Sequence, residues 1–294
     1  MNKGRTPFII AMLAPAVILY GGFFLWPVVQ AFVFSLYRWR GVSSEKTFVG
    51  FENFRKLTAD PVFWKATGNN LWLLVVGGAA IMAISLLVAH GLQGERKSTS
   101  LLRGIFLIPQ MISLVVVAIL WQFIYNPSFG ILTSGMRGVG LGQMVVPWLG
   151  TGSTALGCLA VVFVWHGVGF YTMLFAAAIR SIPSEIVEAA KLDGASGLRQ
   201  FFRVTWPMIW SVARVAVIYL CINALNIFAL VHLMTQGGPD RRSEVMLTYL
   251  YEQAFKVYEF GYATSLAVMN FLIVMLLSGL LMLLFRRDPQ ASRA

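Results

Sequence analysis

The chain has 294 residues, of which 58% are hydrophobic and 12% charged, and its mean hydropathy is +0.73. A soluble protein carries about 25% charged residues, so this composition excludes an ordinary soluble domain and indicates that the lipid bilayer is the solvent. The net charge of +11 does not indicate nucleic-acid binding, because no contiguous basic patch with interleaved aromatic residues is present.

Six apolar stretches are long enough to cross a membrane, because a helix that spans the ~30 Å hydrocarbon core needs about 20 apolar residues. The ~10-residue alternating segments of a membrane β-barrel are missing, so the stretches are expected to be helices. The expected fold class is all-α, a polytopic membrane protein with a single transmembrane domain over residues 1–294. The spans are expected at about 8–36, 69–91, 104–125, 154–179, 208–231 and 264–285.

The first stretch has a basic start, an apolar run and the residues Ala-Pro-Ala at 14–16, a pattern that a cleavable signal peptide shares. The apolar run continues through Leu36, however, and this length exceeds that of a signal peptide. We therefore expect an uncleaved first span, with a cleavable signal peptide as the alternative.

The segment after the first span, 37–68, is mixed in charge and rich in aromatic residues. Asp60 followed by Pro61 is typical of a helix start, with an N-cap carboxylate and proline at the first helical position. We expect a short amphipathic segment here at the outer interface. The aromatic side chains that would form an interfacial belt or a packed cap are Trp39, Phe48, Phe51, Phe54, Phe63 and Trp64.

The basic residues predict the orientation. With both termini in the cytoplasm, the inner segments hold 12 Lys and Arg in about 56 positions, and the outer segments hold 10 in about 92 positions. The twofold higher density inside agrees with the positive-inside rule. Both termini are therefore expected in the cytoplasm.

Ionisable residues are rare inside the expected spans, where they are expensive and usually functional. Only His166 lies deep, and no buried carboxylate is available for an ion-coupled carrier. No phosphate-binding loop for a nucleotide is found. The two cysteines, Cys158 and Cys221, fall in separate spans and offer no metal-ligand spacing. The chain thus has no energy source of its own, and we expect neither catalytic activity nor a metal site.

A charged segment interrupts the apolar pattern at 180–207. Residues 185–192 favour a short helix, after a turn and N-cap at Pro183 and Ser184. Gly194 can adopt the left-handed conformation that ends a helix, and a second helix is expected to restart at about Ser196. From the residues alone, a helix–turn–helix elbow and an ordinary basic loop are equally good interpretations.

The spacing E-A-A-x-x-D-G-A from Glu188, with Pro207 thirteen residues after Gly194, resembles the EAA loop of binding-protein-dependent ABC importer permeases. Three further stretches, 48–70, 107–113 and 233–268, resemble the carbohydrate-uptake branch of these permeases, the maltose and glycerol-phosphate types. The resemblance extends over nearly the whole chain.

The resemblance implies a non-catalytic permease subunit of the bacterial plasma (inner) membrane that forms half of a sugar translocation path. Its partners would be a pair of cytoplasmic ATPase subunits, which bind ATP and Mg, a second permease of similar size and an extracytoplasmic substrate-binding protein. The family pattern makes 180–207 a cytoplasmic coupling loop. The residues that it assigns to ATPase coupling are Glu188, Ala189, Ala190, Asp193, Gly194 and Pro207.

The family pattern also implies that spans four and five line the substrate path. Asparagine and histidine would hydrogen-bond sugar hydroxyls, and aromatic rings would contact the CH faces of the sugar. The candidates are Trp165, His166, Gly167, Phe170, Tyr219, Asn223 and Asn226. The alternative for the asparagines is hydrogen bonding to neighbouring helices. Where maltose-type permeases carry polar contacts, this sequence has Leu220, Ala224 and Ile227, so a maltose site does not transfer directly.

The sequence leaves three further functions open. The substrate could be a phosphorylated polyol such as glycerol 3-phosphate, although the lack of a deep cation slightly favours a neutral oligosaccharide. A secondary carrier and a non-transporting membrane anchor also fit the six spans. In the outer segment 235–245, Arg241 and Arg242 are candidates for pairing with acidic residues of a binding protein, and an ordinary solvated loop fits equally well.

Overall fold

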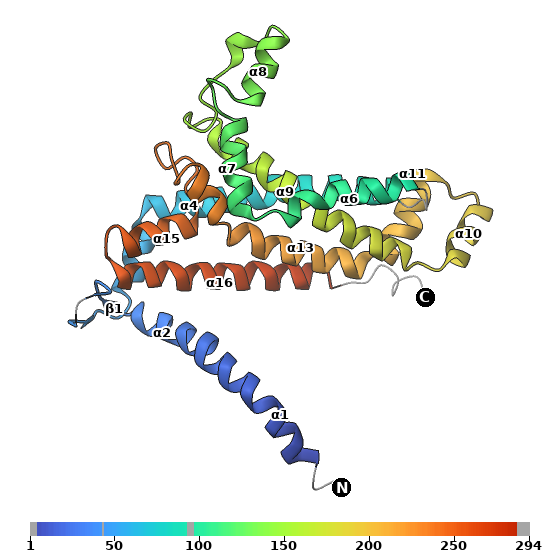
Figure 1. Cartoon of the computed structure of the whole chain (residues 1–294). Helices are drawn as coiled ribbons and strands as arrows, with labels where there is room; N and C mark the ends of the chain where they lie inside the picture. The colour runs from blue at the N-terminus through green and yellow to red at the C-terminus, as the bar shows by residue number, and fades with distance from the viewer. Residues whose placement is uncertain (1–4, 43, 93–96, 287–294) are drawn as a thin grey trace. The chain divides into compact units, whose positions relative to one another are not determined.

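The computed structural model describes residues 5–42, 44–92 and 97–286, and its elements are almost all helical (Figure 1). The sheet in this part of the chain is a single hairpin, in which β1 (Tyr37–Arg38) pairs antiparallel with β2 (Thr47–Phe48). The chain divides into two compact units. Unit one comprises residues 1–63 and 249–272, and unit two comprises residues 64–248 and 273–294.

Unit one begins with a long apolar helix. Its candidate span, Phe8–Phe34, has a hydropathy of 2.3, and no residue in its most apolar window is buried within the chain. The helix continues past Ala16 without a break and ends two residues before Leu36. The elements of unit one are α1 (Arg5–Tyr20), η1 (Gly21–Leu25), α2 (Trp26–Phe34), the hairpin, α3 (Glu52–Ala59) and parts of α15 (Met246–Phe255) and α16 (Phe260–Leu284).

Two segments of unit one that are far apart in the sequence meet at the hairpin. The side-chain amide of Asn53 donates to the carbonyl oxygens of Ser35 (2.8 Å) and Tyr37 (3.0 Å). The backbone N–H of Gly261 donates to the carbonyl of Trp39 (3.0 Å). A Cβ atom on Gly261 would lie 1.9 Å from the carbonyl oxygen of Tyr37, so this crossing requires glycine.

Asp60 is the hydrogen-bonding centre of unit one. One carboxylate oxygen accepts the N–H of Val62 (2.8 Å), which confirms the expected N-cap, and the other accepts the hydroxyls of Tyr249 and Tyr262. Burial raises the pKa of the Asp60 carboxyl, but these bonds and the backbone N–H of Phe63 outweigh burial. The pKa therefore lies below its ordinary value of 3.8.

Unit two holds the remaining elements and the parts of α15 and α16 that unit one lacks. Its elements are α4 (Pro61–Trp72, whose first turn lies in unit one), η2 (Leu73–Gly77), α5 (Gly78–Gly91), α6 (Lys97–Met111), α7 (Leu114–Ile124), α8 (Ile131–Gly138), η3 (Gly142–Met144), α9 (Ala155–Arg180), α10 (Ser184–Leu192), α11 (Gly197–Gln200), η4 (Phe201–Thr205), α12 (Trp206–Met208), α13 (Trp210–Leu225) and α14 (Ala229–Met234).

The second apolar helix differs from the prediction at its start. α4, the π-helical turn η2 and α5 form one uninterrupted helix, Pro61–Gly91, of 31 residues. The prediction of a separate short helix at Asp60 is therefore wrong, and the expected span 69–91 lies within this longer helix. Because Asp60 caps the helix that continues into the span, no break separates the two, and the short helix of this region is α3, which precedes Asp60.

The third apolar stretch is not a straight helix. α6 and α7 are bent by 97° at residues 112–113. Pro109 lies inside the last turn of α6 and lacks the N–H that an α-helix needs, and the backbone of Ser113 is extended, with ψ 134°. The expected continuous helix over 104–125 is thus replaced by a broken one.

Small residues let the helices of unit two approach closely, as in many membrane bundles. A Cβ on Gly169 of α9 would lie 2.0 Å from the carbonyl oxygen of Phe106 of α6, and one on Gly167 would lie 2.9 Å from Ile81 of α5. The Ser85 hydroxyl donates to the carbonyl of Val168 (3.1 Å). α9 is consequently held between α5 and α6.

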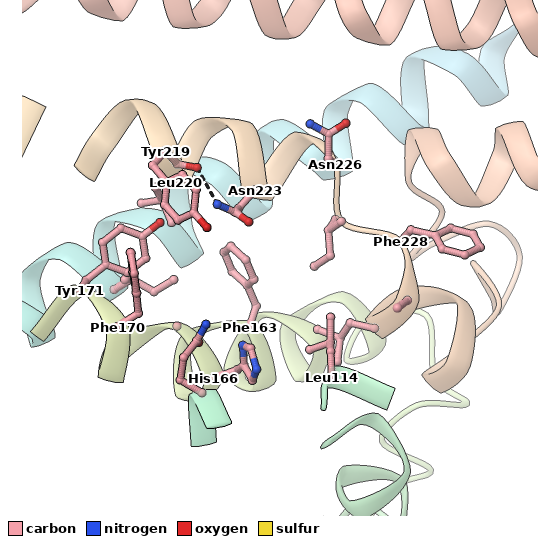
Figure 2. A pocket seen from close by; sticks show the side chains of 16 residues that line it. Leu114, Phe163, His166, Phe170, Tyr171, Tyr219, Leu220, Asn223, Asn226 and Phe228 are labelled. Atoms are coloured by element: carbon pink, nitrogen blue, oxygen red, sulfur yellow. Dashed lines mark hydrogen bonds between the residues drawn. The ribbon is translucent and has the colours of Figure 1, made fainter. Parts of the chain in front are cut away.

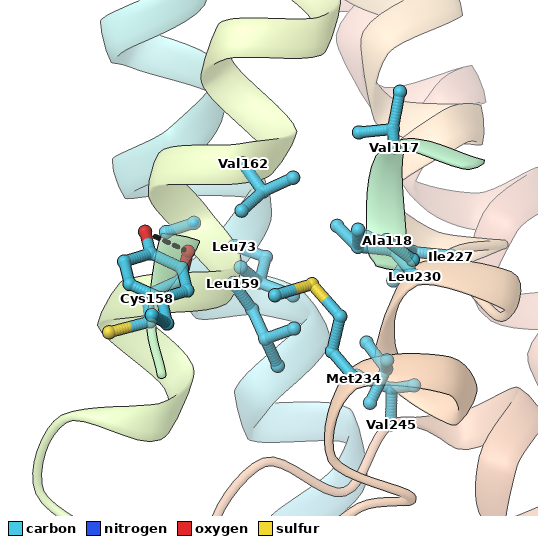
Figure 3. Packing of buried hydrophobic residues seen from close by; sticks show 13 residues of the cluster. Leu73, Val117, Ala118, Cys158, Leu159, Val162, Ile227, Leu230, Met234 and Val245 are labelled. Atoms are coloured by element: carbon cyan, nitrogen blue, oxygen red, sulfur yellow. Dashed lines mark hydrogen bonds between the residues drawn. The ribbon is translucent and has the colours of Figure 1, made fainter. Parts of the chain in front are cut away.

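Two clusters of buried side chains fill the interior of unit two. One includes Leu159 and Val162 of α9 with Leu230 and Met234 of α14 (Figure 3). The other gathers around Phe175, which is fully buried. Tyr125 joins the first cluster and donates its hydroxyl to the carbonyl of Cys158 (3.2 Å).

In the described residues, five helices are long and apolar enough to cross a membrane, and the bent pair α6–α7 would make a sixth. The fifth stretch is interrupted at 226–228, between α13 and α14. The bounds of the five are Phe8–Phe34, Pro61–Gly91, Ala155–Arg180, Trp210–Met234 and Phe260–Leu284.

Candidate functional site

A cavity of about 360 Å³ lies inside unit two, between α9, α13 and the bend of α6–α7 (Figure 2). Most of the side chains around it are apolar or aromatic, and six carry polar groups. Such a lining is typical of a small-molecule site. The residues that line it are Ile81, Gln110, Leu114, Phe163, His166, Gly167, Phe170, Tyr171, Tyr219, Leu220, Asn223, Asn226, Ile227, Phe228, Ala229 and Leu230.

The structure brings six of the seven predicted substrate-path residues together in this cavity. They are His166, Gly167, Phe170, Tyr219, Asn223 and Asn226. The seventh, Trp165, lies outside it and lines an apolar groove of about 640 Å³ between α5, α6 and α9, where its ring is 5.5 Å from that of Trp121. Adjacent helical residues point about 100° apart, so Trp165 and His166 face different surroundings.

His166 connects α9 to the break between α6 and α7. Its imidazole hydrogen-bonds to the backbone of Ile112, which lies at the bend. The same ring lines the cavity. His166 therefore binds a backbone group that the bend exposes, in addition to offering polar atoms to the cavity.

The two predicted asparagines bond within their own helix. Asn223 donates to the carbonyl of Tyr219 (2.8 Å), and Asn226 donates to that of Ile222 (2.9 Å). Each bond uses a single N–H of the amide, and both side chains are exposed at the surface of the chain. The second N–H and the carbonyl oxygen of Asn223 can each form further bonds.

Three apolar residues of α13 and of the break after it occupy the positions for which the resemblance implied polar contacts in maltose-type permeases. Leu220, Ala224 and Ile227 are 3%, 0% and 6% exposed and pack in the apolar interior. Leu220 also packs closely against α5, because a Cβ on Gly78 would lie 3.0 Å from its side chain. In this chain Ala224 serves packing, whereas Leu220 and Ile227 both pack in the interior and line the cavity.

Aromatic rings gather at one end of the cavity. The ring of Phe170 lies 5.4 Å from that of Tyr219 and 5.2 Å from that of Tyr171. Figure 2 shows all three at the same end, with Phe228 at the other. Tyr171, Gln110 and Phe228 also line the cavity but were not among the predicted residues. Gln110 lies in the bent helix and Phe228 in the break after α13, and neither break was expected.

The charged segment 180–207 folds as the helix–turn–helix that we expected. The expected N-cap at Ser184 is wrong, because Ser184 is the first residue of α10 and no side chain caps the helix. Gly194 has φ +78°, and the N–H of Ala195 donates to the carbonyl of Ala190 (2.9 Å), as in the Schellman ending of a helix. The chain then restarts at Gly197 in α11.

No residue of α10 is buried, and most of its residues are exposed. Leu192 and Leu198 are 90% and 72% exposed, and Phe202 is 63% exposed. Glu188 of α10 is also exposed. An apolar surface of this kind is typical of a protein contact.

The segment 235–248 is held by several hydrogen bonds within unit two. Glu244 is 3% exposed; its carboxylate accepts the hydroxyl of Thr248 (2.5 Å) and pairs with Arg241 (3.2 Å). The side-chain amide of Asn69 on α4 donates to the carbonyls of Arg242 and Glu244. Arg241 is thus already engaged inside the chain, and Arg242, which is exposed, is the remaining basic candidate of the predicted pair.

Comparison with known families decides the identity of this chain. The model of the family described as "Binding-protein-dependent transport system inner membrane component" matches residues 81–287. This range includes every residue of the cavity and the whole of α10. The chain belongs to this family.

Relatives of this inner membrane component span nearly its full length. A probable ABC transporter permease protein of Bacillus subtilis (strain 168) is 37% identical over 90% of this chain and 91% of its own. A diacetylchitobiose uptake system permease protein of Streptomyces coelicolor (strain ATCC BAA-471 / A3(2) / M145) is 35% identical over 96% of this chain and 83% of its own. The chain is therefore an ABC transporter permease of the inner membrane.

The fold of this permease is also that of a solved transporter chain. The crystal structure of a bacterial ABC transporter involved in the import of the acidic polysaccharide alginate has a chain with a TM-score of 0.85 and 22% sequence identity. The match covers 97% of both chains. At this identity the likeness concerns the fold alone.

Proposed function

We propose that this permease is one half of the translocation path of a sugar ABC importer, for an oligosaccharide or a related saccharide. Relatives named for diacetylchitobiose, for multiple sugars and for trehalose and maltose support the substrate class. In this proposal residues 1–294 form a single permease domain with six spans, the bent pair α6–α7 counting as one. Both termini lie in the cytoplasm.

α10 and the turn after it act as the coupling element in this proposal. The cytoplasmic ATPase subunit binds the uncovered helix, Glu188 makes charge-assisted contacts, and Ala189 and Ala190 permit a close approach. Gly194 sets the turn, Asp193 ends the helix, and the buried Pro207 begins the return to α13. The observation that carries the proposal is the exposure of this elbow, including Leu192 at 90%.

The chain itself is non-catalytic in this proposal, and ATP and Mg are bound by its partners. These are a pair of ATPase subunits, a second permease of similar size and an extracytoplasmic substrate-binding protein. A family that depends on a binding protein needs such a partner, and a solved relative was crystallised with a periplasmic protein. Arg242, exposed beside the ordered outer segment, is the basic side chain that we expect this protein to contact.

The test is co-purification of the ATPase subunit with the permease. We compare the wild type with Glu188→Arg/Gly194→Pro and measure both ATPase association and ATP turnover. Proline at residue 194 is incompatible with φ +78°, and arginine reverses the contact charge. We expect the wild type to retain the ATPase and the double variant to lose it.

Arg137→Glu is the matched control, because Arg137 is exposed at the end of α8 and lies on the opposite side of the membrane in the proposed topology. It should retain the ATPase. If the wild type binds no ATPase, or the double variant couples normally, the coupling role of 188–207 fails, and ATP-independent uptake by a secondary carrier is the hypothesis to test next.

A further inference from the structure

The cavity of unit two contains a buried hydroxyl group that the protein does not satisfy. Tyr171 is 4% exposed, and its hydroxyl oxygen has no hydrogen-bond partner among the described residues. A buried polar group without a partner is costly and rare in native proteins. Tyr171 also lines the cavity, but its hydroxyl oxygen is covered, so a molecule in the cavity becomes its partner when the Tyr171 ring turns toward it.

A second hydroxyl lies at the same end of the cavity. The ring of Tyr219 is 6.4 Å from that of Tyr171, and Figure 2 shows the two phenols beside each other, with Asn223 next to Tyr219. The amide of Asn223 uses one N–H for the carbonyl of Tyr219 and retains its other groups. Each phenol both donates and accepts, which suits the hydroxyl groups of a saccharide.

The lining of the cavity carries no permanently charged side chain. Its polar groups are amides, hydroxyls and one imidazole, from Gln110, His166, Tyr171, Tyr219, Asn223 and Asn226. A charged ligand group in such surroundings would lose its hydration without gaining a counter-charge, which is strongly unfavourable. The cavity therefore suits an uncharged ligand.

We propose that Tyr171 is a specificity-determining residue of this permease, whose hydroxyl binds a hydroxyl of an uncharged saccharide at the Tyr219 end of the cavity. The rings of Phe163 and Phe170 contact the CH faces of the same sugar. Saccharides that carry a phosphate or a carboxylate are excluded, because no cation neutralises them. This proposal rests on the proposed sugar-import function. It assigns the hydrogen bond to Tyr171, while Leu220 and Ile227 line the cavity with apolar groups.

The experiment uses the complete importer in lipid nanodiscs, without the binding protein, so that the permease alone discriminates between ligands. Saturation-transfer NMR measures the binding of maltose, cellobiose and diacetylchitobiose, and of the 6′-phosphates of the first two. We expect at least one neutral sugar to bind and its phosphorylated counterpart to bind more than about tenfold more weakly. Tyr171→Phe should weaken the binding of the neutral sugar about five- to tenfold, the effect of one hydrogen bond.

Three comparisons make the result decisive. Tyr171→Phe should not lower the melting temperature, because its hydroxyl has no protein partner among the described residues, and Tyr219→Phe, in which residue 219 is 47% exposed, provides a second test of the site. Tyr125→Phe removes a buried phenol hydroxyl outside the cavity and should leave sugar binding unchanged. If neutral sugar binds equally well to Tyr171→Phe and Tyr219→Phe, or if the phosphorylated sugar binds as well as the neutral one, the proposal is overturned.

The same preparation separates this proposal from the proposed function. Binding-protein-stimulated ATP hydrolysis and uptake are measured with each neutral sugar in proteoliposomes. Loss of ATPase association and of all sugar-dependent hydrolysis in the wild type would contradict the import function. Normal sugar uptake with unchanged Tyr171→Phe kinetics would contradict only the role of Tyr171.

Discussion

Single side chains set the local order of this permease where charge is scarce. Asp60 is an example, because its carboxylate caps α4 through Val62 and accepts hydroxyls from Tyr249 and Tyr262, which are almost two hundred residues away in sequence. One residue therefore joins the start of a helix to the region where α15 ends and α16 begins within unit one.

Replacing Asp60 with asparagine should destabilise unit one. The amide has one acceptor atom in place of two, and it directs N–H groups at a position that two phenols occupy as donors. We expect a loss of about 1–2 kcal/mol in the free energy of unfolding, measured by denaturation in detergent. Thr58→Val, which removes an exposed hydroxyl from α3, should have little effect, and an equal loss in both variants would contradict the role of Asp60.

The acid dependence of stability follows from the same carboxylate. Its folded pKa lies below the ordinary value of 3.8, so the unfolded chain binds a proton more readily than the folded one. The stabilisation is complete above about pH 5 and is lost as the pH falls through the lower folded pKa. The melting-temperature gap between wild type and Asp60→Asn should therefore narrow below about pH 4. A gap that stays constant down to about pH 3 would contradict this account.

The cavity shows how far sequence reasoning reaches at this scale. The helical spacing of His166, Gly167 and Phe170 placed them on a common face, and the structure confirms this. Tyr171 was not predicted as a cavity residue, because no local sequence pattern distinguishes a tyrosine in an apolar stretch. It lines the cavity because α13 lies opposite to it. Trp165 was misplaced because aromatic composition alone does not reveal which side of a helix faces a groove.

At the scale of elements, glycine positions determine which helices can cross. Gly169 on α9 packs against the backbone of α6, and no side chain fits between them. Residues 112–113 then turn the chain into α7, where His166 holds the bend. The length of the apolar stretch predicted one helix over 104–125. Hydropathy alone reveals neither the 97° bend nor the restart of the helix at Leu114.

Gly169→Ala should separate α6 from α9, because the new Cβ would lie 2.0 Å from the carbonyl oxygen of Phe106. We expect a loss of about 1–3 kcal/mol, as in overpacked cores. The free thiols of Cys158 and Cys221 are buried, so a thiol-reactive dye reports the unfolding temperature.

Gly157→Ala on the same helix is the matched control, because nothing lies within 4 Å of a Cβ at that position. Alanine has the higher helix propensity, so this variant should be neutral or slightly more stable. A similar drop in unfolding temperature for both variants would show that α9 tolerates neither change for reasons other than the crossing with α6.

At the scale of the whole molecule, composition predicted the class correctly, because a membrane helix needs only length and apolarity. The EAA spacing was sufficient to indicate the family. The division into two units and the helix breaks depend on contacts between distant residues such as Asp60 and Tyr262, which no local pattern encodes. The proposed topology rests on the distribution of basic residues.

The topology predicts opposite accessibility for two exposed serines. In a background with Cys158→Ala and Cys221→Ala, Ser196→Cys between α10 and α11 should react with an impermeant maleimide only from the cytoplasmic side. Ser134→Cys on α8 should react only from the outside, because one span, α9, separates the two positions. The measurement is labelling of whole cells against inverted vesicles. Labelling of both positions from the same side would require an even number of crossings between them, in conflict with the six-span proposal.

The π-helical turn η2 has a consequence for how one helix serves two neighbours. Before it, Asn69 and Asn70 hold the segment 235–248 and α13; after it, Ile81 and Ser85 pack on α9. A π turn holds one residue more than an α turn, so it advances the angular phase of everything that follows by about 100°. Deleting a single residue from 73–77 would restore a uniform helix and rotate the α9-facing side away from its partner. η2 thus rotates the second half of the helix relative to the first, so that each half turns its contacting residues toward its own neighbours.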